Sequence, residues 1–370
     1  MVRVLVVSHS AQVRDLVLWK SLLQLDSDID LVLPELKLNE RHRTSGESIH
    51  HPRVFSLPAV EPFGDGHSAM WIRRLKRFAD SGDYDLVHVA FEPWALIPQI
   101  LCGNRRIVVH AAESVLKSAP WQLRARRFGM TRVLNKAAGM LTWGNTSLEE
   151  FREIGLPAST PQGVIPVGVP DPKVFVSSPM DVSDGRLRLL FVGRVIPAKG
   201  IVTLVKAACG MNRPVTLRVL GDGDLAESLP QLVSGCPYVE LLIEGPAPAE
   251  EVAAAMAWSH IVVVPSEPTS SWNEQWGRVA VEAMLSGRPT VVSDNGELPH
   301  LIEEPELVFS AGNADALRKI LIRLDENRDA LPELGEKLRV SAGRFKPDRL
   351  ALQVVNFWKT IDSREEGKFV

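Results

Sequence analysis

Short runs of apolar, β-branched residues alternate with longer stretches of helical pattern along the whole 370-residue chain. The expected strands lie at 3–8, 29–34, 85–91, 106–110, 139–144, 163–168, 187–193, 215–221, 239–245, 260–266 and 289–294. Strands that are apolar on both faces are typical of parallel sheets covered by helices on both sides. The sequence therefore predicts an α/β fold made of two tandem, Rossmann-like, doubly wound domains.

The length of the chain agrees with this division, because domains commonly hold about 150 to 200 residues. The segment PVGVPDPKVF at 166–175 is rich in proline and glycine and is the best candidate for a linker. We expect an N-terminal domain at 1–168, a C-terminal domain at 169–345 and a final helical segment at 346–370.

Charge, cysteine content and hydropathy exclude several classes of protein. The net charge of −3 does not indicate a nucleic-acid-binding protein. Cys102, Cys209 and Cys236 have no paired spacing, which favours reduced thiols in the cytosol and argues against a zinc site. The opening MVRVLVVSHS resembles a strand more than a signal peptide, and no window is apolar enough to cross a bilayer. We expect a cytoplasmic protein with at most peripheral membrane contact.

Two acids in the second half, Glu274 and Glu282, stand eight residues apart around a Trp-Gly-Arg break. Glu282 interrupts the otherwise apolar run 279–285, and a carboxylate there needs partners because burying it unpaired is costly. At helical rise the two acids would lie roughly 12 Å apart, about the span from sugar to ribose in a nucleotide sugar. Gly277 between them would let backbone approach such a ligand closely.

Two cations follow an expected strand that ends at Gly193. Arg194 and Lys199 come directly before a helix that begins near Gly200. Positive side chains beside the free N–H groups of a helix N-terminus form an anion site. The next strand ends in a Gly-Asp-Gly turn at 221–223, which is either a backbone requirement or a contact with the same ligand.

These motifs together resemble glycosyltransferase family 4. The pair Glu274-x7-Glu282 and the segments GRVIPAKG, VLGDGD, VVVPS and SGRPTVVSDNGELPHLI occur in the order found in that family. In the first half the resemblance depends on strand order, on GVIPVGVPDPKVF and on GNTSLEEF. It implies the GT-B fold, with two domains facing a central cleft, and the final helix packing back on the first domain. It also implies transfer of a sugar from a nucleotide donor with retention, without a metal or other cofactor.

The resemblance assigns roles to individual residues. Arg194 and Lys199 would hold the donor diphosphate and stabilise the leaving nucleoside diphosphate. Glu282 would bind the ribose, and Glu274 would contact the transferred sugar. Glu274, the two cations and His110 would make up the catalytic set.

Further residues would line the donor site. Gly277 and Arg278 would lie beside the phosphates through backbone, with Gly193 and Gly221 nearby. The base would lie near Pro246. From the first half, His110 would lie near the donor sugar, and Glu113 could reach the same cleft.

The sequence also departs from the family pattern. Ser8-His9-Ser10 stand where the family usually has a glycine pair, and His300 stands where many members have Glu. Two alternatives therefore stay open: a catalytically silent nucleotide-sugar-binding partner subunit, and a GT-B sugar-nucleotide 2-epimerase. The acceptor could be a sugar, a lipid-linked molecule or another small molecule.

Two other patterns have ordinary explanations. The basic stretches 71–78 and 124–136 are typical of surface helices, although contact with an anionic membrane is the alternative. Asp-x-Asp patterns flank several strands, where aspartate commonly caps helices or forms turns, so we expect no metal site.

Overall fold

The computed structural model describes residues 2–10, 13–25, 28–36, 51–60, 69–103, 105–112, 129–183, 185–270 and 272–366. The chain divides into two compact units. The first contains Met1–Val169 together with Pro347–Val370, and the second is Pro170–Lys346. The expected boundaries were 168/169 and 345/346.

The first unit is built on one sheet whose described strands follow the order β4-β3-β2-β1-β5-β6-β7-β8. All neighbours are parallel except β3 and β4. Its elements are β1 (Val4–Ser8), α1 (Val13–Leu25), β2 (Ile29–Leu36), β3 (Val54–Val60), β4 (Trp71–Ile72), α2 (Leu75–Ser81), β5 (Leu86–Ala90), α3 (Leu96–Leu101), β6 (Ile107–Ala111), β7 (Gly139–Thr142), α5 (Asn145–Glu153), β8 (Gln162–Val164) and α13 (Pro347–Glu366).

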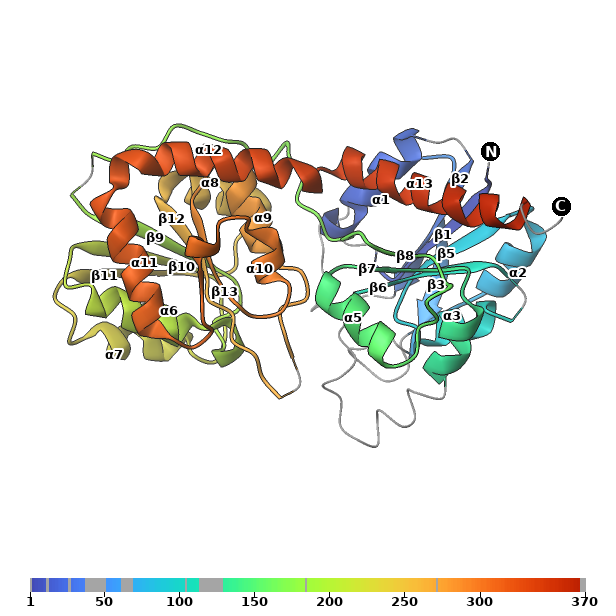
Figure 1. The fold of residues 1–370 in the computed structure, drawn as a ribbon, viewed down its shortest axis with the longest axis horizontal. Coiled ribbons are helices and arrows are strands. Elements are labelled where there is room, and N and C mark those ends of the chain that lie inside the picture. Colours follow the sequence, from blue (N-terminus) through green and yellow to red (C-terminus); the bar gives the residue numbers. More distant parts are fainter. Residues whose placement is uncertain are drawn as a thin grey trace. The chain divides into compact units, whose positions relative to one another are not determined.

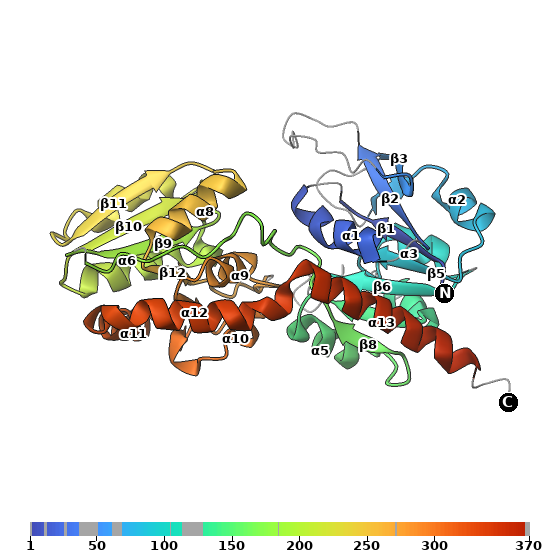
Figure 2. The same ribbon diagram turned by 90° about the horizontal axis from the view of Figure 1, so that it is seen from above.

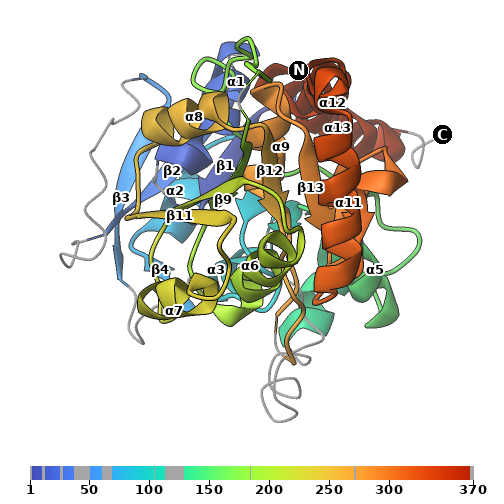
Figure 3. The same cartoon turned by 90° about the vertical axis from the view of Figure 1, so that its left-hand side faces the viewer.

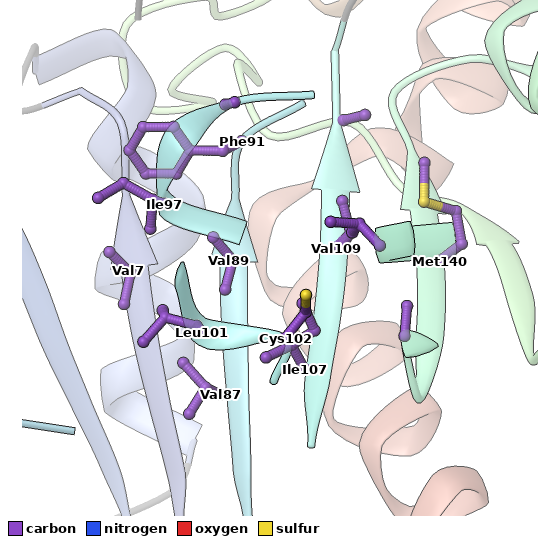
Figure 4. Packing of buried hydrophobic residues seen from close by; sticks show 14 of the residues in the cluster. Val7, Val87, Val89, Phe91, Ile97, Leu101, Cys102, Ile107, Val109 and Met140 are labelled. Atoms are coloured by element: carbon purple, nitrogen blue, oxygen red, sulfur yellow. The ribbon is translucent and has the colours of Figure 1, made fainter. Parts of the chain in front are cut away.

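Helices cover both faces of this sheet, with α1 and α13 on one side and α3 and α5 on the other (Figure 1). Figure 4 shows the core under α3, where valines of the central strands meet the helix side chains; it labels Val7, Val87, Val89, Phe91, Ile97, Leu101, Cys102, Ile107, Val109 and Met140. The strands β1, β5 and β6 are buried along their whole length, as the continuous apolar runs predict.

A chain of hydrogen bonds ties the last helix to the centre of the first unit. Helix α13 lies beside α1 (Figures 1 and 2). The Trp358 indole N–H donates to Nδ1 of His88 (3.0 Å), so His88 Nε2–H donates to Nδ1 of His110 (3.0 Å). Nε2–H of His110 in turn donates to the carbonyl of Ile165 (2.6 Å). Both imidazoles are buried, and this arrangement requires both to be neutral.

The second unit has a parallel sheet with the described order β11-β10-β9-β12-β13-β14. Its elements are β9 (Leu187–Val192), α6 (Ile201–Gly210), β10 (Val215–Leu220), α7 (Leu229–Val233), β11 (Val239–Glu244), α8 (Ala249–Trp258), β12 (Ile261–Val264), α9 (Arg278–Leu285), β13 (Thr290–Ser293), α10 (Leu298–Leu301), β14 (Val308–Phe309), α11 (Ala314–Glu326) and α12 (Leu331–Ala342). Helices α8 and α9 cover one face and α6 and α7 the other (Figure 3). The prediction of two doubly wound α/β domains is confirmed.

Some local expectations were wrong. Strand β3 was missed because its residues alternate between half-buried and exposed, unlike the continuous apolar runs. The stretch 71–78 is not one helix: Trp71 and Ile72 form β4, Arg74 adopts a left-handed conformation, and the helix begins only at Leu75. In the other basic stretch, residues 129–136 are helical, and 124–128 lie outside the described residues.

The expectation of three reduced thiols was also wrong. Cys209, near the end of α6, and Cys236, just before β11, form a disulfide with 5.3 Å between their Cα atoms. They are 27 residues apart in sequence. The crossover from β10 to the edge strand β11 brings Cys236 close to Cys209. Cys102 is a free, buried thiol in the first unit.

Candidate donor-binding site of the second unit

The topology of the second sheet defines the place where a ligand is expected. From β9 the chain moves outward to β10 and β11, and from β12 it moves the other way to β13 and β14. The strand order therefore reverses between the neighbours β9 and β12. In open α/β sheets ligands bind outside the carboxyl ends of the strands at this point. The loops that follow β9 and β12 carry most of the predicted site residues.

Lys199 and Glu274 meet in front of this point. Nζ of Lys199 donates to Oε2 of Glu274 at 2.6 Å, and the hydroxyl of buried Ser266 donates to the same oxygen at 2.7 Å. The side chain of Lys199 is 21% exposed and that of Glu274 is 11% exposed, so the pair is partly shielded from solvent. Oε1 of Glu274 has no hydrogen-bond partner among the described residues. This oxygen can accept a hydrogen bond from a ligand hydroxyl.

Helix α9 starts at a glycine and holds the second acid. Gly277 has φ of +73°, and a Cβ there would lie 2.4 Å from Cδ2 of Leu298, so only glycine fits. One turn into the helix, Nε of Arg278 donates to Oε1 of Glu282 at 2.7 Å. The buried Glu282 therefore has the cationic partner that its apolar surroundings demand.

Arg194 stands at the end of β9 with an exposed side chain. Its guanidinium makes no hydrogen bond or ion pair with any residue that the structure describes. Gly221, after β10, packs directly on this loop: a Cβ there would lie 1.9 Å from the carbonyl oxygen of Gly193. The backbone of the two strand ends therefore touches, and Arg194 projects from a loop that Gly221 holds in place.

Pro246 is exposed and follows β11, the edge strand, two strands away from β9. Just before it, Glu244 accepts two hydrogen bonds from Arg218 (2.6 and 2.8 Å), which lower the pKa of its carboxyl group. Pro246 lies at the same edge of the sheet as the other residues but apart from the Lys199–Glu274 pair.

Of the residues expected from the first half, the structure describes His110 and His9. His110 is fully buried, with both ring nitrogens bonded to His88 and Ile165, and burial lowers its pKa to about 4. His9 is half-buried at the end of β1, where Nδ1 lies 2.9 Å from the carbonyl oxygen of Ala90. Glu113 lies outside the described residues. Spacing along the chain cannot distinguish the last buried residue of a strand from the first one beyond it.

Several residues at this edge were not predicted. Trp272 lies with its ring 4.5 Å from Nζ of Lys199, and Thr203 donates to Oε1 of Glu267 at 2.6 Å. Asn295, after β13, is buried, and both polar atoms of its amide lack partners among the described residues. Ser266 ends one expected strand, Glu267 directly follows it, and Asn295 directly follows another. These positions at strand ends are the signal that could have identified them.

Two further observations concern the described residues only. They contain no group of three or more histidine, cysteine or acidic side chains placed to hold a metal ion. None of their helices is both long enough and apolar enough to cross a membrane.

Comparison with known proteins agrees with this geometry. Residues 186–327, which lie in the second unit, match the family Glycosyl transferases group 1. The sulfoquinovosyl transferase SQD2 of Arabidopsis thaliana is 27% identical over 162 residues, which are 42% of this chain and 30% of that protein. A D-inositol 3-phosphate glycosyltransferase of Pseudarthrobacter chlorophenolicus is 27% identical over 278 residues, 66% of this chain and 63% of that protein. The chain thus spans less than two thirds of the length of these two relatives.

A longer match is the MMP alpha-(1->4)-mannosyltransferase of Mycolicibacterium hassiacum, 23% identical over 89% of this chain and 80% of that protein. Among solved structures, a sucrose-phosphate synthase from Thermosynechococcus elongatus has a TM-score of 0.75 at 17% identity and covers 98% of this chain and 100% of its own. Anabaena HepE in complex with UDP and glucose has a TM-score of 0.72 at 19% identity and covers 97% and 100%. The fold is therefore that of the GT-B glycosyltransferases.

Proposed function

We propose that the protein is a glycosyltransferase that takes a sugar from a nucleotide-diphosphate donor bound to the second unit and transfers it to a hydroxyl acceptor. The observation that carries the proposal is the pairing of Lys199 with Glu274 at the switch point of the second sheet. On the same loop as Lys199, the guanidinium of Arg194 has no partner among the described residues. Cationic side chains and carboxylates that can accept hydrogen bonds from hydroxyl groups are thereby concentrated at the carboxyl ends of the strands. A diphosphate attached to two sugars requires both kinds of group. The match to Glycosyl transferases group 1 over this unit and the solved complexes of HepE with UDP and UDP-glucose support the same assignment.

Each side chain has a role that follows from its chemistry. Arg194 and Lys199 would bind the diphosphate and stabilise the negative charge that develops on it as the sugar departs. The N-terminal N–H groups of α9, at Gly277 and Arg278, would add to this site. Glu282 would accept hydrogen bonds from the ribose hydroxyls, and Oε1 of Glu274 would accept one from the transferred sugar.

We further propose retention of configuration without a bound metal. Two cationic side chains can supply the charge stabilisation that a divalent ion gives in other transferases. In a front-face reaction the departing phosphate oxygen takes the proton of the acceptor hydroxyl as the new bond forms. The enzyme then needs no separate general base on the acceptor side.

A thermal-shift panel of nucleoside diphosphates and their sugars, run in EDTA, tests the proposal. A ligand at 100 times its Kd stabilises the folded state by about 2.7 kcal/mol, which such an assay resolves. We expect one nucleoside diphosphate to stabilise the protein, and Arg194→Ala or Glu282→Ala to weaken the effect. No shift with any nucleotide in a folded sample would refute the proposal of a donor site.

Product analysis separates the transferase from the two alternatives. A silent binding subunit would show the thermal shift but neither donor hydrolysis nor transfer, with or without Lys199→Ala. A 2-epimerase would convert the donor sugar when no acceptor is present. Transfer with retention, lost on Lys199→Ala and unchanged by EDTA, is the expected result.

A further inference from the structure

The loop between β12 and α9 places an indole ring over the central lysine of the proposed site. The centroid of the Trp272 ring lies 4.5 Å from Nζ of Lys199, within the range of a cation–π interaction. Trp272 is half-buried, and its carbonyl accepts a hydrogen bond from the Thr269 N–H at 2.9 Å. This hydrogen bond constrains the backbone from which the ring projects onto Lys199.

The ammonium of Lys199 thus has two kinds of partner. Glu274 binds it by a charge-assisted hydrogen bond of 2.6 Å, while Trp272 contacts it through the negative face of the indole. A lysine side chain has a flexible four-carbon stem, so a single ion pair fixes its position only weakly. The ring adds a second constraint that uses none of the three N–H donors.

We propose that Trp272 is a positioning residue that keeps the Lys199 ammonium at the diphosphate position when a donor takes it over from Glu274. The inference depends on the proposed function, because it assigns how the same site handles its donor. Trp272 would touch Lys199 and act through it.

The geometry explains why such a residue is needed. A bound diphosphate competes with Glu274 for the same ammonium, and the Glu274 carboxylate would be left partly buried without its cation. Oε1 and Oε2 of Glu274 can then accept hydrogen bonds from hydroxyl groups of the transferred sugar. Because the ring face holds the lysine throughout, the ammonium can change its anionic partner without returning to water. The exchange then favours a nucleotide sugar over the bare nucleoside diphosphate, because the latter lacks the transferred sugar whose hydroxyls would bind Glu274.

A double-mutant cycle tests this directly. Binding of UDP and UDP-glucose, or of the nucleotide pair selected by the thermal-shift panel, is measured by calorimetry for Trp272→Leu and Trp272→Phe, each alone and with Lys199→Met. Loss of a partly buried cation–π contact weakens binding about fivefold, so Trp272→Leu should show this loss. Trp272→Phe keeps an aromatic face and should restore most of the affinity. With Lys199→Met, the Leu change should have no further effect.

Trp258 provides a matched control in the same unit. Its ring also lies near cations, at 5.8 Å from the guanidinium of Arg188 and 5.4 Å from that of Arg218. It belongs to α8 and contributes nothing to the proposed site. Trp258→Leu should therefore leave the affinity for UDP unchanged, and thermal unfolding without nucleotide confirms that every variant is folded.

The possible failures are distinguishable. If the wild-type protein binds no nucleoside diphosphate, the proposed function is refuted and this inference with it. If it binds one, but Trp272→Leu does not weaken binding, or weakens it equally with Lys199→Met, only the positioning role of Trp272 is refuted. A loss that Trp272→Phe does not restore would likewise assign Trp272 a purely structural role.

Discussion

Reduction of the Cys209–Cys236 bond should destabilise the second unit selectively. The bond closes a loop with a sequence separation of 27 residues. In the chain-entropy description, a cross-link over a loop of that length removes about 12 cal/mol/K from the unfolded ensemble, or about 3.5 kcal/mol at 25 °C. For a unit of this size, each kcal/mol corresponds to roughly 2–4 °C in Tm. We therefore expect a decrease of roughly 7–14 °C on reduction.

Differential scanning calorimetry with and without a phosphine reductant measures this effect. The two units should give separable thermal transitions. The transition whose Tm rises when a nucleoside diphosphate is added belongs to the second unit. Only that transition should fall on reduction. The double variant Cys209→Ser with Cys236→Ser should match the reduced wild type, and Cys102→Ser should not move that transition.

Thiol titration in denaturant supplies the decisive check. The oxidised protein should titrate one thiol, Cys102, and the reduced protein all three. Three thiols in protein purified without reductant would show that the bond does not form. One thiol before and three after reduction, with an unmoved transition, would instead refute the entropic argument.

Three further predictions concern buried groups and one tight turn. Burial lowers the pKa of His88, and it lowers the pKa of His110 from an ordinary 6.5 to about 4. Between pH 4 and pH 6.5 the unfolded chain therefore binds more protons than the folded chain. The free energy of unfolding of the first unit should therefore be highest above pH 6.5 and should fall by up to about 3 kcal/mol on account of His110 as the pH falls to 4. Urea unfolding at several pH values measures this change, and a free energy that does not vary with pH would contradict the neutral pair. Asn295→Leu removes an amide without partners among the described residues and should raise the stability of the second unit by about 1–2 kcal/mol, whereas a loss would mean that the amide is satisfied. Gly221→Ala places a Cβ 1.9 Å from the carbonyl oxygen of Gly193 and should lower the stability of the second unit by more than about 1 kcal/mol, with a lower Tm and weaker nucleotide binding. An unchanged Tm would show that the two loops can separate.

Several residues of the candidate site could be predicted to lie together because they are local to strand ends. Gly193, Arg194 and Lys199 follow one strand, and Gly277 begins the helix that carries Glu282. Glu282 was expected to need partners, and a cation meets both acids. The sequence pattern could not predict the contact between Lys199 and Glu274. That contact depends on β9 and β12 lying side by side in the sheet.

The features that the sequence did not predict are those made by contacts distant along the chain. The disulfide joins helix α6 to the segment just before β11, and β10 lies between them in the sequence. The spacing between the cysteines therefore did not indicate that they pair. His110 was expected at a strand end, but β6 continues to Ala111 and leaves its imidazole inside, against His88. Burial at the last residue of a strand depends on the neighbouring strands and on α13, which no local pattern reports.

The return of α13 to the first unit has a consequence for synthesis on the ribosome. Residues 1–169 emerge long before 347–370, so the first unit lacks one of its covering helices until α13 has been synthesised. Until then, Nδ1 of His88 has no indole N–H to bind, and one face of α1 is uncovered. The second unit, continuous in sequence, can complete its fold earlier. The domain made first is thus the one finished last, and a nascent chain truncated before Pro347 should contain a folded second unit beside an incomplete first one.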